Sequence, residues 1–129
     1  MTRILIIEDD EEMCTELNEI LNGEGYFVQT CFNGERGIGL AGEAAYDIVL
    51  LDLKLPGMSG YEVLKRLKNE YPRLKVLILT GSPLPNKYLP EEEFISSSGY
   101  DDIALESAEG VINKPFDIEQ LLETIKKLI

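Results

Sequence analysis

The sequence contains no histidine. Catalysis by Ser–His or Cys–His pairs, metal binding through imidazole and a role as phosphohistidine donor are therefore excluded. Cysteine is scarce, and Cys14 and Cys31 form no CxxC pattern. This predicts neither a disulfide framework nor a zinc site, and it favours a reducing cytoplasmic location. Long apolar runs are also missing: the N-terminal run is too short for a signal peptide and none approaches membrane-spanning length, so we expect no membrane insertion.

Basic residues are outnumbered two to one, with 12 Lys and Arg against 24 Asp and Glu and a net charge of −12. Binding to phosphate backbones or anionic lipid depends on basic patches, so we expect neither nucleic acid nor membrane as a partner. The charge suits basic protein surfaces or metal cations. Acidity that only keeps the protein soluble is the simpler explanation when the charge is taken alone.

Apolar runs alternate with helical periodicities along the 129 residues, a length typical of one domain. Several runs are continuous Ile, Leu and Val stretches, as in parallel strands that are covered on both faces. The predicted strands are Ile4–Ile7, Tyr26–Phe32, Ile48–Leu53, Val76–Thr80 and Gly110–Asn113.

Helical spacing of apolar residues follows most of these strands. The second helix contains Gly37, Gly39 and Gly42 in its interior, each costing roughly 1 kcal/mol relative to alanine, so we predict that it is the weakest. The predicted helices include Met13–Leu21, about 34–45, Tyr61–Leu67 and Ile118–Leu128.

This alternation predicts an α/β fold, a (βα)5 flavodoxin-like doubly wound parallel sheet with strand order 2-1-3-4-5. In that order the carboxyl ends of the first and third strands lie side by side, where such sheets bind ligands. We expect a single domain over residues 1–129, with no effector domain after the last predicted helix.

Chemically active residue types stand at the predicted strand ends. Glu8 and Asp9 follow the first strand and Asp52 lies in the third, so three carboxylates should converge in a pocket suited to Mg²⁺. Thr80 ends the fourth strand and Lys114 follows the fifth. Taken singly, each has an ordinary explanation as a strand-end acid, a strand cap or a solvated lysine. Together they predict a phosphoryl-transfer site. The acids that come next, residues 10–12, are placed to cap and begin the first helix.

These motifs resemble a response-regulator receiver domain of two-component signalling, over Thr2 to Ile129. "RILIIEDDE" is similar to the family's acidic start, "VLILTG" to its hydroxyl strand and "INKPF" to its lysine segment. "VLLDLKLPGMSGYEVLKRLK" is similar to the phosphoacceptor segment and carries the specific pattern D-x-x-x-P-G-M-x-G from Asp52 to Gly60.

The resemblance implies a metal-binding set. Asp9 and Asp52 would ligate Mg²⁺, Glu8 would help to hold it, partly through water, and the backbone carbonyl of Lys54 would complete the protein ligands.

The resemblance also implies the roles of the phosphoryl-binding residues. Asp52 would attack the phosphorus of a phosphohistidine on a sensor histidine kinase or phosphotransfer protein, or of a small phosphodonor. Thr80 would hydrogen-bond the phosphoryl group, and Lys114 would pair with it. Pro115 is often preceded by a cis peptide bond in the family. The added charge would alter the surface formed by the fourth strand, fourth helix and fifth strand for a downstream protein effector, and a phosphorylation-dependent dimer is a further expectation.

Two features depart from the family pattern. Val111 occupies the position where receivers carry an aromatic residue or a histidine whose rotation reports phosphorylation. A valine does not make this rotation, so the family's coupling between the threonine and the aromatic side chain is not expected in its usual form. Tyr100 or Phe94 are the candidate substitutes. The segment 81–109 is atypically long, with a predicted helix start at Pro90. A second short helix is predicted to be capped by Asp101 or Asp102 and to run through Ala108. Two explanations compete evenly for it: a lid or partner surface specific to this protein, and a tolerated surface insertion. Lys54 and Ser82 flank the site where the family tunes acyl-phosphate hydrolysis.

The leading hypothesis is a phosphorylatable switch that assists its own phosphorylation and dephosphorylation and is not a metabolic enzyme. A Mg²⁺-dependent phosphohydrolase on a similar sheet is an alternative, but Asp52-Leu53-Lys54 lacks the second acid of a DxD pair. A flavin carrier would need a different phosphate loop. A receiver-like interaction module that is never phosphorylated is the third option, which Val111 favours and the acids, Thr80 and Lys114 oppose.

Overall fold

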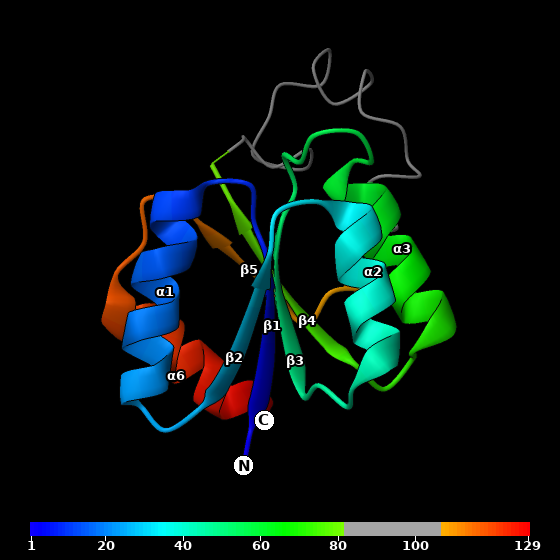
Figure 1. Cartoon of the computed structure of the whole chain (residues 1–129). Helices are drawn as coiled ribbons and strands as arrows, with labels where there is room; N and C mark the ends of the chain where they lie inside the picture. Colours follow the sequence, from blue (N-terminus) through cyan, green and yellow to red (C-terminus); the bar gives the residue numbers. More distant parts are fainter. Residues whose placement is uncertain (82–106) are drawn as a thin grey trace.

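Five parallel strands form one sheet in the order β2-β1-β3-β4-β5 (Figure 1), which confirms the predicted α/β alternation and strand order. The computed structural model describes residues 1–81 and 107–129. The strands are β1 (Arg3–Ile7), β2 (Phe27–Cys31), β3 (Ile48–Asp52), β4 (Lys75–Thr80) and β5 (Gly110–Asn113).

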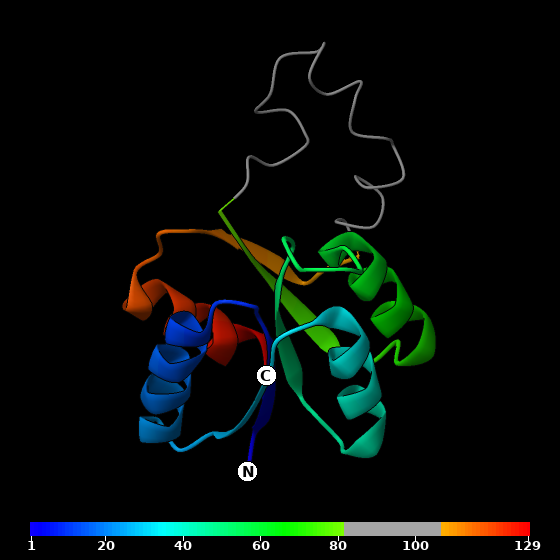
Figure 2. The same cartoon turned by 45° about the horizontal axis from the view of Figure 1, so that its top comes forward.

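Helices cover both faces of the sheet: α1 and α6 lie on one face and α2 and α3 on the other (Figures 1 and 2). The predicted helix start at Pro90 and the predicted cap at Asp101 or Asp102 lie outside the described residues. Residues 107–109 form a turn and bend, so the second short helix predicted there does not reach Ala108. The described helices are α1 (Glu11–Gly23), α2 (Gly34–Glu43), α3 (Gly60–Glu70) and α6 (Ile118–Leu128).

The apolar run of β1 supplies both layers of the core. Ile4 and Ile6 pack in the layer under α1 and α6, while Leu5 and Ile7 pack in the layer under α2 and α3. Alternate strand residues point to opposite faces, so a strand covered on both sides needs an unbroken apolar run. β2 is an edge strand with alternating exposure, and it ends at Cys31, one residue before the predicted end.

The glycines of α2 allow this helix to lie close to its neighbours. A Cβ added at Gly37 would lie 2.4 Å from Cδ1 of Ile7, and one at Gly34 would lie 2.3 Å from Cγ2 of Val63. Gly39, in contrast, has no such atom within 4 Å. Two of these glycines therefore serve tight packing of α2 on β1 and α3, a role that helix propensity alone does not reveal.

The first helix begins as predicted. Asp10 is the N-cap, and its carboxylate accepts a hydrogen bond from the backbone N–H of Met13 at 3.2 Å. Glu11 and Glu12 occupy the first turn, where the helix dipole favours acids. The three acids that follow Asp9 therefore have a structural explanation.

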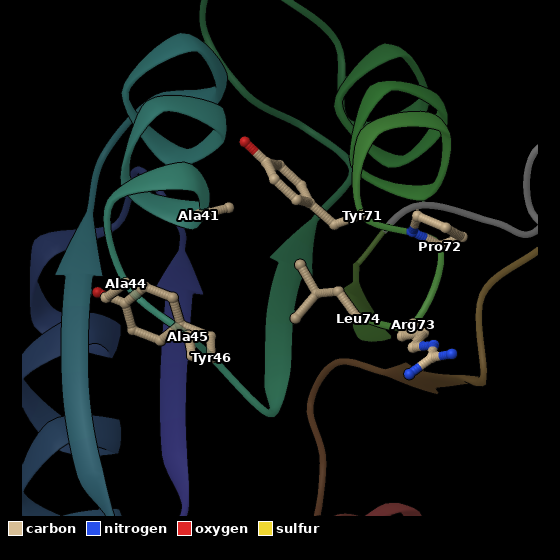
Figure 3. A pocket seen from close by; sticks show the side chains of 8 residues that line it. All are labelled: Ala41, Ala44, Ala45, Tyr46, Tyr71, Pro72, Arg73 and Leu74. Carbon is tan, nitrogen blue, oxygen red and sulfur yellow. The ribbon is translucent and has the colours of Figure 1, made fainter.

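A groove lies at the amino end of the strands, between the ends of α2 and α3 (Figure 3). The ring of Tyr71 points from the end of α3 towards α2, and the Oη atom of Tyr71 would lie 2.5 Å from a Cβ added at Gly42. The groove is lined by Ala41, Ala44, Ala45, Tyr46, Tyr71, Pro72, Arg73 and Leu74.

Among the described helices, none is both long enough and apolar enough to cross a bilayer.

Candidate functional site

Four strands deliver the predicted functional residues to the carboxyl edge of the sheet, the upper edge in Figure 1. Glu8 and Asp9 directly follow β1, Asp52 ends β3, Thr80 ends β4, and Lys114 directly follows β5. β1 lies beside β3, which lies beside β4, so the strand order itself brings these ends together.

Three carboxylates meet at this edge. One oxygen from each of Glu8, Asp9 and Asp52 lies within 4.8 Å of the others, an arrangement that could hold a metal ion. Glu8 is 2% exposed and Asp52 is 5% exposed, whereas Asp9 is exposed. Two acids of this cluster are thus buried, a position that acids occupy only with compensation from a cation or from hydrogen bonds.

Lys114 supplies part of that compensation. Its Nζ lies 2.5 Å from Oε1 of Glu8 and 3.7 Å from Oδ1 of Asp52. The backbone N–H of Lys114 donates to the carbonyl of Thr80 at 2.8 Å, which extends the pairing of β4 and β5 by one residue. The Lys114–Pro115 peptide bond is cis, as the resemblance implied. Thr80, the last residue of β4, is fully buried.

The negative charges of these carboxylates are nevertheless only partly compensated by Lys114. Burial, followed by the charge and hydrogen bonding of Asp52, raises the pKa of Glu8, and the contact with Lys114 offsets this in part. Burial and then Glu8 raise the pKa of Asp9. Within residues 1–81 and 107–129, the ammonium of Lys114 alone forms ion pairs with these carboxylates, and one positive charge does not neutralise three negative ones. The described part of this edge can therefore accommodate a further cation.

Backbone contacts hold Glu8 on two sides. The N–H of Glu8 donates to the carbonyl of Cys31 at 3.0 Å, and the thiol of Cys14 donates to the carbonyl of Glu8 at 3.3 Å. Burial, with the charge of Glu8 second, raises the pKa of Cys14 to about 12, which keeps the thiol protonated as a donor. Burial raises the pKa of Cys31 to about 11. Sequence reasoning missed this support, because cysteine spacing is informative for disulfides and metals but not for packing around an acid.

The loop after β3 depends on two glycines. Gly57 has a φ of 75°, which disfavours other residues. A Cβ on Gly60 would lie 2.3 Å from Cα of Leu53 and 2.6 Å from the carbonyl oxygen of Asp52, so a larger residue would push the phosphoacceptor segment aside. The backbone N–H of Lys54 donates to Oδ1 of Asp52 at 3.3 Å. Part of the D-x-x-x-P-G-M-x-G pattern is therefore explained by chain geometry around the acid.

Of the two predicted departures from the family pattern, the long segment 81–109 lies mostly outside the described residues and stays a prediction. Val111 is 36% exposed on β5. Tyr100, Phe94 and Ser82 lie outside the described residues, so their predicted contributions stay predictions.

The sheet order and the acid cluster at the carboxyl edge define a class, a receiver-type α/β fold. A family model for the response regulator receiver domain matches residues 4–88, and the chain belongs to this family.

Individual relatives agree with the family assignment. The chain is 39% identical over 124 residues to the transcriptional regulatory protein YkoG of Bacillus subtilis, covering 95% of this chain and 49% of YkoG. It is 35% identical over 127 residues to the cell cycle response regulator CtrA of Brucella ovis, covering 98% of this chain and 50% of CtrA. The chain thus spans about half the length of these curated relatives.

A solved relative shares the whole fold. Response regulator TrrA of Thermotoga maritima, crystallised with Mg²⁺ and BeF, is 31% identical with a TM-score of 0.82, and the match covers 100% of both chains. TrrA has also been solved in complex with the histidine kinase ThkA; that structure is 30% identical with a TM-score of 0.82, covering 100% of this chain and 99% of TrrA.

Proposed function

We propose that this receiver domain accepts a phosphoryl group on Asp52, with Mg²⁺ held beside it, and passes the change to a protein effector. The observation that carries the proposal is the buried Asp52 carboxylate, which lies within 4.8 Å of the carboxylates of Glu8 and Asp9 and has Lys114 Nζ at 3.7 Å. Phosphoryl transfer needs a nucleophile, a metal pocket and a fixed cation within reach of one phosphoryl group, and this edge carries all of these residue types.

The donor set suits Mg²⁺. Carboxylate oxygens are its preferred protein ligands, and a divalent cation would offset the burial and the neighbouring carboxylate charge that raise the pKa values of Glu8 and Asp9. We assign the protein ligands as Glu8, Asp9, Asp52 and the backbone carbonyl of Lys54. When bound, the metal would neutralise the phosphoryl oxygens. TrrA, which was crystallised with Mg²⁺ and BeF, supports this assignment.

The chemistry follows from the chain's own groups. An Oδ atom of ionised Asp52 attacks the phosphorus of a donor phosphohistidine, a P–O bond forms as the P–N bond breaks, and the leaving imidazole takes up a proton. Lys114 exchanges its contact with Glu8 for a phosphoryl oxygen. The hydroxyl of Thr80, at the end of the adjacent strand, hydrogen-bonds another. The phosphoryl group adds about −1.5 to −2 charge to the site at pH 7.

Partners and location follow from the same proposal. A sensor histidine kinase or a phosphotransfer protein would supply the phosphoryl group, and the ThkA complex of TrrA supports this partner class. The effector surface would be the one around β4, the following helix and β5, and phosphorylation-dependent dimerisation is one form it could take. We propose a cytoplasmic location and a non-enzymatic role, apart from assistance to the domain's own phosphorylation and dephosphorylation.

Intact-mass spectrometry tests the proposal. The protein is incubated with acetyl phosphate or phosphoramidate in the presence of Mg²⁺, and we expect the added mass of one phosphoryl group, lost when EDTA replaces Mg²⁺. Asp52→Asn should give no adduct. Asp47→Asn is the matched control: Asp47 precedes the same strand at its opposite end, is exposed, and should leave the adduct unchanged.

Each alternative has its own outcome. An unmodified wild-type protein that still binds its partner would replace the proposal with a phosphorylation-independent interaction module. Release of inorganic phosphate over many turnovers would indicate a phosphohydrolase. An adduct that survives Asp52→Asn would move the phosphoacceptor elsewhere.

A further inference from the structure

The edge strand β5 has little apolar burial to set its position along β4. It contains four residues, and of these Ile112 alone is buried, at 3% exposure. Strand register is strongly specified where a whole face is buried and weakly specified in short, exposed strands. A slip by one residue would move Lys114 by about 3.3 Å along the sheet and turn its side chain to the other face. The contact of Lys114 with Glu8 and Asp52 therefore depends on what fixes β5.

Glu109 fixes β5 at its opposite end. Its backbone N–H donates to the carbonyl of Val76 at 2.9 Å, and its Oε1 accepts from the N–H of Val76 at 2.7 Å. The carboxylate thus takes the place of a strand acceptor for the first buried N–H on this side of β4. Val76 is fully buried, so loss of the carboxylate would leave this donor without its partner.

Lys68 of α3 holds that carboxylate in place. Its Nζ lies 2.8 Å from Oε2 and 3.0 Å from Oε1 of Glu109, and it donates to the carbonyl of Leu74 at 3.0 Å. The Lys68 side chain is 18% exposed and that of Glu109 is 26% exposed. The side chains of Lys68 and Glu109 are thus less exposed than those of the ion pair of Arg66 and Glu62 on α3, which are 53% and 40% exposed. Partial burial and several hydrogen bonds make such an ion pair position-specific.

We propose that Glu109 and Lys68 are positioning residues that lock the register of β5 and so place the ammonium of Lys114 at the phosphoacceptor site, roughly 16 Å away along the strand. The register they set pairs Leu77 with Gly110 and Thr80 with Asn113. The effect of a misplaced Lys114 on phosphorylation rests on the proposed function. The register lock itself does not depend on that function.

Amide hydrogen exchange tests the lock without any phosphorylation. The backbone amide of Lys114 is hydrogen-bonded to the carbonyl of Thr80. In Lys68→Met, the exchange rate of this amide, relative to the rates of amides in β1 and β3, should rise about tenfold. Glu109→Gln, which keeps an acceptor for Val76 but loses the charge, should show the same selective change at smaller size. Arg66→Met, with the same loss of charge on α3, should change the ratio by less than about twofold. Equal acceleration across all strands, or no change at Lys114 in both variants, would overturn the lock.

A double-mutant cycle tests the consequence. Lys68→Met should slow phosphorylation by acetyl phosphate by about tenfold in the wild type and by less than about twofold in a Lys114→Ala background, because the lock acts through Lys114. An equal slowing in both backgrounds would show that Lys68 does not act through Lys114. A wild-type protein that accepts no phosphoryl group would refute the proposed function, while the exchange measurement would still decide the register lock.

Discussion

The carboxyl and amino ends of the strands differ in how their charged side chains are paired. The carboxyl edge gathers three carboxylates, two of them buried, beside the ammonium of Lys114, and burial together with the neighbouring carboxylate raises the pKa values of Glu8 and Asp9. The amino edge pairs its sheltered carboxylate, Glu109, with Lys68 and a backbone N–H, and its groove is lined by alanines, aromatics and Leu74. One edge keeps unbalanced charge that a ligand can use, and the other pairs the carboxylate of Glu109 with the ammonium of Lys68.

The comparison indicates how stability and function are divided in this domain. Binding sites commonly retain unfavourable charge that is relieved only when the ligand arrives, whereas residues remote from the site are selected for packing. Substitutions in the groove at the amino edge should therefore lower stability and spare the metal site, whereas those of Glu109 and Lys68 should act on the carboxyl edge through the position of Lys114. Substitutions in the acid cluster should abolish the metal site and leave stability equal or higher.

The largest effect is expected from the amino edge. Leu74→Ala removes a side chain that is 8% exposed, packs in the α2–α3 core layer and lines the groove, so the free energy of unfolding should fall by about 3 kcal/mol in urea titration. Mg²⁺ affinity should stay within about twofold of the wild type, because the site lies at the other edge. Arg73→Ala, exposed in the same groove, is the control and should change stability by less than about 0.5 kcal/mol. A loss of Mg²⁺ binding in Leu74→Ala would contradict the separation of the edges.

Magnesium should stabilise the wild-type protein. At a free Mg²⁺ concentration ten times its Kd, the free energy of unfolding should rise by about 1.4 kcal/mol, measured by thermal or urea unfolding. Asp52→Asn should show a much smaller gain at the same concentration. A gain of equal size in both proteins would mean that the ion binds elsewhere on this acidic surface.

Asp52→Asn should raise stability in the absence of metal by about 1 kcal/mol, within the range of single substitutions. The reason is that the charge of Asp52 helps to raise the pKa of Glu8, and a neutral amide of the same shape removes that repulsion. Unfolding in urea with EDTA measures it, with Asp47→Asn at the amino end of β3 as the control. A less stable Asp52→Asn protein would show that the contact with Lys114 outweighs the repulsion.

The smallest effect concerns pH. The pKa of Glu8 is raised in the folded state, so its contribution to stability is fully present below the unfolded value near 4.5 and is lost as pH rises through the folded pKa. Without metal, Glu8→Gln should therefore lose less stability than the wild type between acid and neutral pH. Unfolding curves at a series of pH values, in EDTA, test this. Parallel pH profiles of the two proteins would contradict a raised pKa for Glu8.

Local signals in the sequence predicted the strands of the sheet well. Continuous apolar runs marked β1 and β3 because both are covered on two faces, and Asp10 was placed as a cap because its chemistry acts within one helical turn. The predicted ends of β2 and β3 each lie one residue too far along the chain, because a local pattern does not fix where strand pairing stops. The convergence of Glu8, Asp9 and Asp52 also followed from strand order, once the alternation had been recognised.

By itself, the sequence determined the α/β class, the acids at the strand ends and the family resemblance, because each depends on residue type and spacing along the chain. The tertiary structure decided which acids are buried, that Lys114 contacts Glu8, and that Glu109 and Lys68 meet at the start of β5. It also decided that two glycines of α2 serve close packing. The physical reason is the same in each case: these contacts join residues far apart in the chain, and their distances depend on strand register and helix placement, which no local pattern contains.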